Sequence, residues 1–416
     1  MSFDQFNLDS RLSAGIKRAG FVKPTPIQQK AIPVAMQGGD LIGTAQTGTG
    51  KTAAFVLPIL NKLVHGPHKK IRALIVTPTR ELADQINDTV RSFAKDAGLR
   101  SVTVYGGVGA TPQIQAVKRG VEIVVACPGR LLDLVAKGHI NLKTVEILVL
   151  DEADRMFDMG FLPDIRRIIK LVPNERQTML FSATFPKEVE QLARQSLRNP
   201  QRISVGLSRP AHTVSHVLYP VPQHLKRKLL FELLKETSTD SVLIFTRTKH
   251  RARRLMFQLQ KANYKVTSLH SNRSQNQRKR ALNGFKSGRF QMMVATDIAA
   301  RGLDVDTISH VINFDMPDTA DAYIHRIGRT GRAKRTGDAI TLSTPDDEAL
   351  IRKLERIMKQ KMQRLFIEDF DYDVPAPPRQ PRQPRRKKRN SNSPSRQGKR
   401  PQRSKRRSDQ RSNRGS

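Results

Sequence analysis

The chain reads Ala45-Gln46-Thr47-Gly48-Thr49-Gly50-Lys51-Thr52 between a short apolar segment, Leu41–Gly43, and a helix-like segment. Glycines at such a place let backbone N–H groups turn toward phosphate oxygens, and the N-terminus of the following helix adds positive potential. Lys51 would neutralise the β- and γ-phosphates of a nucleotide, and the Thr52 hydroxyl would bind Mg²⁺. This stretch therefore predicts a phosphate-binding loop after a strand, although Ala45 stands where the usual pattern has glycine.

A second apolar segment, Val145–Leu150, ends in the acidic run Asp151-Glu152-Ala153-Asp154. A nucleotide site needs a carboxylate at the end of a neighbouring strand, where Asp151 would reach Mg²⁺ directly or through water. Glu152 would then orient and deprotonate the attacking water. Acidic residues also favour helix N-termini, but the position after a phosphate loop and an apolar strand favours catalysis.

The rest of the chain alternates apolar runs with amphipathic stretches, in two series. Continuous apolar strands between helices indicate parallel sheets covered on both faces, so the predicted fold class is α/β with two tandem domains. We predict a first domain at 1–205, a linker at 206–213, a second domain at 214–372 and a tail at 373–416. The predicted strands are Ala73–Thr77, Ser101–Tyr105, Glu122–Ala126, Glu146–Asp151, Thr178–Ser182, Ser241–Thr246, Lys265–Leu269, Gln291–Thr296, His310–Phe314 and Asp338–Ser343.

Charge and composition point to a polyanionic partner. The chain has 74 Lys and Arg against 37 Asp and Glu, a net charge of +37, which favours nucleic acid through counterion release. From Pro375 onward there are 16 Lys or Arg, one acidic residue and a single apolar residue, Ala376. Such a segment buries too little surface to offset its ordering entropy, so we expect a disordered tail whose charge favours nucleic acid.

Other classes of protein fit this sequence less well. No apolar run approaches the ~20 residues that cross a bilayer, and the N-terminus lacks a signal-peptide pattern. The single cysteine, Cys127, permits no internal disulfide and fits a reducing compartment. These observations predict a cytoplasmic protein without a membrane partner.

Asp151-Glu152-Ala153-Asp154, with about a dozen further motifs in the same order, resembles the DEAD-box RNA helicases of superfamily 2. The resemblance covers nearly all of residues 1–370 and is strongest to the bacterial RhlE-type branch, on the run Asp154–Phe161 and the basic tail. It implies two RecA-like domains, ATP and Mg²⁺, and RNA held by its backbone without sequence preference. It also implies a monomeric motor, with ribosomal particles or RNA-decay proteins as candidate partners.

The resemblance assigns roles around the nucleotide. In the run Gly20–Gln28, Gln28 would bond the adenine edge and Phe21 would pack on the ring. Arg329 and Arg332 would act as arginine fingers on the γ-phosphate. The implied catalytic set is Lys51, Asp151, Glu152, Arg329 and Arg332, with Thr52 and Asp151 on the metal. The nucleotide-binding set is Phe21, Gln28, Ala45, Gln46, Thr47, Gly48, Thr49, Gly50, Lys51, Thr52 and Asp304.

The resemblance also assigns RNA-binding and coupling residues. Backbone N–H groups, Thr hydroxyls and Arg side chains at strand ends hold phosphates without reading bases. The residues that would link the ATP state to RNA are Asp154, Ser182, Thr184 and His325. The implied RNA-binding residues are Pro78, Thr79, Arg80, Gly107, Pro128, Gly129, Arg130, Thr246, Arg247, Gln275, Arg278 and Thr296.

Two departures and three alternatives stay open at this stage. Cys127 replaces a usual Thr, and its thiol is a weak donor for a phosphate; Ser271 replaces a usual Gly. The motifs serve an ATP-gated RNA clamp as well as a helicase. A DNA translocase and a non-motor nucleotide-binding protein are further alternatives, which the RNA-type motifs and the arginine motif disfavour.

Overall fold

A computed structural model describes residues 2–45, 48–205, 214–237, 241–300, 308–331 and 337–376. The described residues up to Val374 form one compact unit. Predictions made for Gln46, Thr47, Asp304, Arg332, the 206–213 linker and the tail beyond residue 376 lie outside the described residues.

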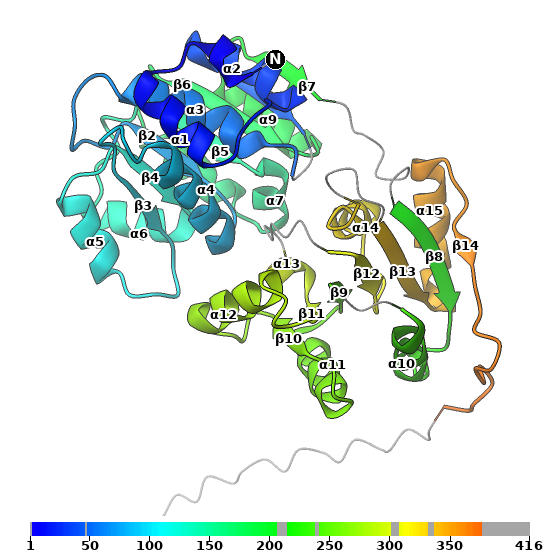
Figure 1. Ribbon diagram of the computed structural model, residues 1–416. Coiled ribbons are helices and arrows are strands. Elements are labelled where there is room, and N and C mark those ends of the chain that lie inside the picture. Colours follow the sequence, from blue (N-terminus) through cyan, green and yellow to red (C-terminus); the bar gives the residue numbers. More distant parts are fainter. Residues whose placement is uncertain are drawn as a thin grey trace, which may run out of the picture. The chain divides into compact units, whose positions relative to one another are not determined.

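The first lobe, residues 2–205, is a seven-stranded parallel sheet with the strand order β3-β4-β2-β5-β6-β1-β7 (Figure 1). Its strands are β1 (Leu41–Thr44), β2 (Ala73–Val76), β3 (Ser101–Val104), β4 (Ile123–Ala126), β5 (Ile147–Asp151), β6 (Gln177–Ser182) and β7 (Gln201–Ser204). Its helices are η1 (Phe3–Phe6), α1 (Ser10–Arg18), α2 (Pro26–Met36), α3 (Lys51–Leu63), α4 (Arg80–Phe93), α5 (Thr111–Lys118), α6 (Pro128–Ala136), α7 (Ala153–Asp158), α8 (Leu162–Ile169) and α9 (Lys187–Ser196).

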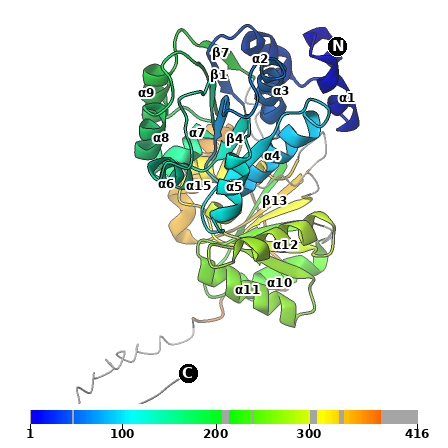
Figure 2. The same ribbon diagram turned by 90° about the vertical axis from the view of Figure 1, so that its left-hand side faces the viewer.

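Helices cover both faces of this sheet, as the continuous apolar strands predict. One core packs α1 to α4 against one face, and the other packs α6 to α9 against the opposite face (Figure 2). The central strands β2, β4, β5 and β6 are buried at every position, whereas the edge strand β3 alternates buried and partly buried residues. All the predicted first-lobe strands form, with ends that differ by one residue at most.

The second lobe, residues 214–374, holds another seven-stranded parallel sheet, in the order β10-β11-β9-β12-β13-β8-β14. Its strands are β8 (Val214–Pro220), β9 (Val242–Phe245), β10 (Val266–Leu269), β11 (Met292–Ala295), β12 (His310–Asn313), β13 (Gly337–Ser343) and β14 (Gln363–Arg364). Its helices are α10 (Lys226–Glu236), α11 (Lys249–Lys261), α12 (Gln275–Lys286), α13 (Asp297–Ala300), α14 (Ala320–Ile327), η3 (Pro345–Asp347) and α15 (Glu348–Met358). The predicted fold class, two tandem parallel-sheet α/β units, is confirmed.

The two sheets repeat one topology. Each strand of the second sheet takes the place of the strand seven numbers lower in the first sheet. The registers match as well, because Ala73 pairs with Ile147 in one sheet and Val242 pairs with His310 in the other. Equivalent positions can therefore be assigned residue by residue along β2 and β9, and along β5 and β12.

Within the described residues, no helix is long and apolar enough to cross a membrane.

Candidate functional site

The phosphate loop ends where α3 begins. Gly50 has a φ of +93°, a left-handed conformation that strains any residue with a Cβ. Lys51 is the first residue of α3, is buried, and donates from Nζ to the carbonyl of Ala45 at 2.7 Å. The lysine thus points back across its own loop, toward the volume that the loop encloses.

Gln28 ties the N-terminal region to this loop. Its Nε2 donates to the carbonyl of Gly50 at 3.0 Å, and its Oε1 accepts from the backbone N–H of Thr25 at 2.8 Å. The amide is buried and keeps unused bonding capacity on both ends. Phe21 packs edge-on against Phe93, with ring centroids 5.1 Å apart, and against Phe3. Adenine recognition by Gln28 and Phe21 stays a prediction, while support of the loop by Gln28 is direct.

The acidic run begins on the last residue of β5. Asp151 and Glu152 are both buried, and Asp151 Oδ1 accepts from the backbone N–H of Glu152 at 3.0 Å. Glu152 has a φ of +54°, which is uncommon for a residue with a side chain and typical of functional sites. Its carboxylate pairs with Arg155 at 2.8 Å, and both side chains are about 4% exposed.

Burial raises the pKa of Asp151 to about 7, against the opposing effect of Lys51 and with a further rise from Glu152. A carboxyl with such a pKa is only partly ionised near pH 7, and a bound cation would favour its charged form. The Thr52 hydroxyl and the Asp151 carboxylate are hard oxygen donors, as Mg²⁺ requires. Mg²⁺ is commonly held by one or two protein groups together with substrate phosphates.

The predicted coupling residues of the first lobe contact one another. Asp154 Oδ2 accepts from both the backbone N–H and the hydroxyl of Thr184, each at 3.0 Å. Ser182 Oγ accepts from the Asp154 backbone N–H at 3.1 Å and donates to the Thr184 carbonyl at 2.7 Å. This network joins the end of β5 to the end of β6. Burial, aided by Arg155, lowers the pKa of His325 to about 4, so that its ring is neutral near pH 7.

The first-lobe residues that are predicted to bind RNA lie at strand ends. Thr79 caps α4, accepting from the Leu82 backbone N–H at 3.3 Å. Gly107 has a φ of +75°, a left-handed conformation that strains any residue with a Cβ, and it lies against the guanidinium of Arg80. A cavity of about 560 Å³ is lined by Pro78, Thr79, Arg80, Glu81, Gly106, Cys127, Gly129, Arg130, Asp133, Met159, Phe161, Ser271, Arg273, Gln275, Arg278 and Ile298.

Pro128 is buried as the first residue of α6, so it shapes the loop and presents only backbone. Arg130 donates to the carbonyl of Val108 at 3.3 Å and 3.4 Å. Burial raises the pKa of Cys127 to about 12, so the residue that replaces a usual Thr stays a neutral thiol. Both departures, Cys127 and Ser271, line the cavity.

The second-lobe residues that are predicted to bind RNA range from exposed to fully buried. Arg278 forms an ion pair with Glu81 at 2.7 Å, and Gln275 lies 3.4 Å from the same carboxylate. Arg247 is exposed. Thr246 is fully buried, and its hydroxyl donates to the Thr248 carbonyl at 3.4 Å. The burial of Thr246 does not support direct phosphate contact by its side chain.

Two charged residues near these groups, Glu81 and Arg326, received no role from the sequence. Glu81 forms an ion pair with Arg278. The sequence feature that could have identified it is an acidic residue directly after the motif at 78–80. Arg326 is buried and donates to both carboxylate oxygens of Asp297 at 2.6 Å, and to Asn313 Oδ1 at 3.0 Å. The recurrence of arginine at 326, 329 and 332 predicts one helix face, but not that Arg326 faces the core. Arg329, also buried, follows α14.

A glycine loop before a helix, with a carboxylate at the end of a nearby parallel strand, defines a P-loop nucleoside triphosphatase. The family model of the DEAD/DEAH box helicases matches residues 25–192, and that of the helicase conserved C-terminal domain matches residues 225–334. The chain is 45% identical over 371 residues to DEAD-box ATP-dependent RNA helicase 30 of Arabidopsis thaliana, covering 87% of this chain and 62% of that relative. It is 44% identical over 364 residues to RNA helicase CrhR of Synechocystis, covering 87% of this chain and 74% of that relative.

The fold agrees with solved structures. S. cerevisiae Dbp5 bound to RNA and ADP BeF3 superposes with a TM-score of 0.78 at 30% identity, over 88% of this chain and 95% of that one. The chain therefore belongs to the DEAD-box ATP-dependent RNA helicases, which are RNA-stimulated ATPases.

Proposed function

We propose that the two lobes carry out RNA-stimulated ATP hydrolysis with the residues described above. Lys51 and the loop that it crosses bind the triphosphate, and Glu152 positions and deprotonates water. Arg329 stabilises charge on the transferring phosphoryl group. Thr52 and Asp151 would hold Mg²⁺, which offsets phosphate charge when bound. The observation that carries the proposal is the Asp154–Thr184 pair: Asp154 Oδ2 accepts two hydrogen bonds from Thr184, each at 3.0 Å, and so links the catalytic strand end to a neighbouring strand end.

RNA is held by its backbone in this proposal. Thr79, Arg80, Arg130, Gln275 and Arg278 offer hydroxyl, amide and guanidinium groups, which bind phosphates of any sequence. Glu81 forms an ion pair with Arg278, so we expect an RNA phosphate to replace this carboxylate as the partner of Arg278 when RNA binds. A gripped, bent strand no longer fits a duplex, and the partner strand leaves. Hydrolysis then resets the protein.

Several finer points rest on the sequence resemblance alone and belong to the proposal. These are the bacterial RhlE-type branch, a cytoplasmic location, a monomeric motor, and ribosomal particles or RNA-decay proteins as partners. The named relatives span plants and cyanobacteria, which supports the family and leaves the branch a prediction.

The test is ATP hydrolysis by the full chain with single-stranded RNA, with DNA, and without nucleic acid. We expect strong stimulation by RNA alone. Glu152→Gln keeps the shape of the side chain but removes the base, so turnover should fall by about 10²–10⁴-fold while RNA stays bound with ATP. Normal turnover in this variant would contradict the role of Glu152. Equal stimulation by DNA would favour a translocase. ATP-gated RNA binding without strand separation in a duplex-release assay would favour a clamp.

A further inference from the structure

The second lobe keeps the residue positions of a nucleotide site. Because the registers of the two sheets match, Phe314 takes the place of Asp151 and Asp315 takes the place of Glu152. Lys226 is the first residue of α10, as Lys51 is the first residue of α3.

The loops before these two helices start alike. The Ala45 backbone N–H donates to the Ser182 carbonyl, and the Val221 backbone N–H donates to the Ser343 carbonyl. The second loop then reads Val221-Pro222-Gln223-His224-Leu225, without glycine and one residue shorter. It lacks the backbone freedom to curl around phosphate.

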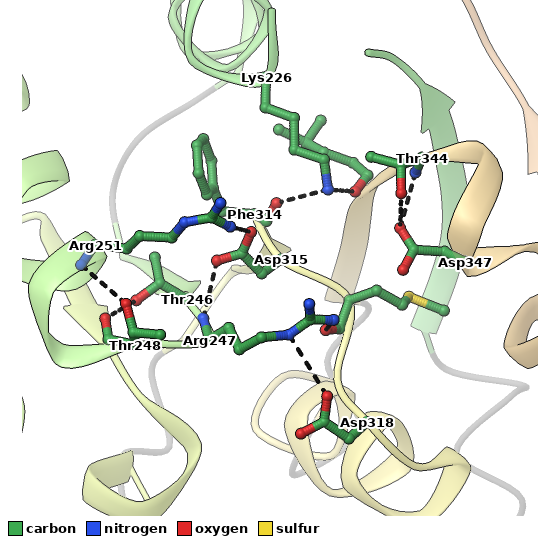
Figure 3. Close-up of polar contacts among 12 residues, drawn as sticks. Lys226, Thr246, Arg247, Thr248, Arg251, Phe314, Asp315, Asp318, Thr344 and Asp347 are labelled. Atoms are coloured by element: carbon green, nitrogen blue, oxygen red, sulfur yellow. Dashed lines mark hydrogen bonds and ion pairs between the residues drawn. The ribbon is translucent and has the colours of Figure 1, made fainter. Parts of the chain in front are cut away.

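In the second lobe the lysine amine is bonded to backbone carbonyls at strand ends. Lys226 is buried and donates to the carbonyls of Leu342 at 2.6 Å and Phe314 at 3.2 Å (Figure 3). Burial lowers the pKa of this lysine, against the opposing effect of Asp315. With its amine bonded to two strand-end carbonyls, Lys226 fixes the ends of β12 and β13 and is not available to a nucleotide.

Asp315 faces the loop that carries Arg247. Its carboxylate is buried and accepts from the Arg247 backbone N–H at 2.9 Å and from the Arg251 guanidinium. Thr248, next along this loop, caps α11 by accepting from the Arg251 backbone N–H at 3.2 Å. From the other side, Arg326 donates to the backbone carbonyl of Asp315 at 2.7 Å. Asp315 therefore lies between the Arg247 loop and α14, the helix that leads to Arg329.

We propose that these inherited positions now serve RNA binding: Asp315 is a positioning residue that holds the Arg247 loop in its RNA-competent shape, and Lys226 fixes the strand end that carries Asp315. This inference rests on the proposed RNA role of Arg247. A buried carboxylate bonded to a backbone N–H fixes one loop geometry, whereas stability alone would be served as well by apolar packing. The second lobe thereby exchanges a nucleotide site for a rigid RNA contact.

The experiment compares Asp315→Asn with Asp318→Asn in the full chain. Asp318 is the matched control, because it pairs with the same Arg247 at 3.5 Å but its side chain is 83% exposed, where an ion pair contributes little. The Asp315→Asn change places an NH₂ group opposite either the Arg247 backbone N–H or the Arg251 guanidinium, so one of the two hydrogen bonds is lost. We expect the apparent KM for RNA to rise about tenfold, with kcat at saturating RNA and the Kd for nucleotide within about twofold of wild type.

Two more variants keep the test independent of folding defects. Arg251→Gln removes the ion pair from a partly exposed side chain and should raise the KM for RNA by about threefold. Arg247→Gln should raise it as well, and adding Asp315→Asn to that variant should change it little further. An effect of Arg247→Gln without any effect of Asp315→Asn or Arg251→Gln overturns the positioning role alone. No effect of Arg247→Gln overturns the RNA assignment of the loop, and the positioning role with it.

Discussion

Replacing Thr184 by Val should weaken the coupling between nucleotide and RNA. The change removes one hydrogen bond, from the Thr184 hydroxyl to Asp154 Oδ2 at 3.0 Å, and keeps the side-chain shape. A bond to a charged acceptor contributes about 1.5–3 kcal/mol. The Asp154 carboxylate still accepts from the backbone N–H groups of Thr184 and Arg155, both at 3.0 Å. We therefore take the lower end, about 1.5 kcal/mol, which is roughly tenfold in an equilibrium constant.

The assay is the ratio of RNA Kd values without and with a non-hydrolysable ATP analogue. We expect this ratio to fall about tenfold, and linkage requires an equal fall in the effect of RNA on nucleotide affinity. Thr178→Val is the matched control: its hydroxyl is buried on β6, the strand that leads to Thr184, and has no hydrogen-bond partner. A ratio within twofold of wild type in Thr184→Val, or an equal loss in Thr178→Val, would refute the assignment.

Four further predictions follow from charge. Because Asp151 has a pKa of about 7 and must ionise to bind Mg²⁺, the affinity for Mg-nucleotide should fall about tenfold from pH 8 to pH 6; calorimetric titration checks this, and a flat profile contradicts it. Because the folded-state pKa lies above the ordinary value of 3.8, folding stability should fall between about pH 4 and pH 7 and level off above pH 7, so Asp151→Asn should remove that slope in thermal unfolding. Arg329→Gln should lower kcat by about 10³-fold or more with little change in nucleotide Kd, measured by single-turnover hydrolysis. Deleting residues 375–416, which carry +15, should weaken RNA binding and reduce its salt slope while basal ATPase survives; an unchanged slope in anisotropy titrations would exclude the tail as an RNA contact.

The sequence predicts the first-lobe site well because its chemistry lies in short contiguous runs. The glycines before Lys51 and the carboxylates after β5 are local signals, and each central strand is an unbroken apolar run. Strand β8 escaped prediction because buried and more exposed residues alternate along it, so that it forms no apolar run. Strands β7 and β14 escaped prediction because they are short and mostly exposed. For such edge strands, neither an apolar run nor a clean alternation exists to be found.

The direction of individual side chains was the second feature that the sequence could not predict. The amino-acid sequence alone does not indicate that Arg326 contacts Asp297, or that Thr246 is buried. The repeat of one topology was equally hidden, because equivalent positions hold different residues: Asp151 and Glu152 in one lobe correspond to Phe314 and Asp315 in the other. Only the register of the strands makes the comparison possible.

The position of β1 has a consequence for synthesis of the chain. This strand, which leads into the phosphate loop, pairs only with β6 and β7 among the described strands of its sheet. Both partners lie more than 130 residues later, at Gln177–Ser182 and Gln201–Ser204. A nascent chain that ends before Gln177 therefore has no neighbour for β1, and the start of its phosphate loop lacks the bond from the Ala45 backbone N–H to the Ser182 carbonyl. On the ribosome, the capacity to bind ATP should arise in one late step, after almost the entire first lobe has been made.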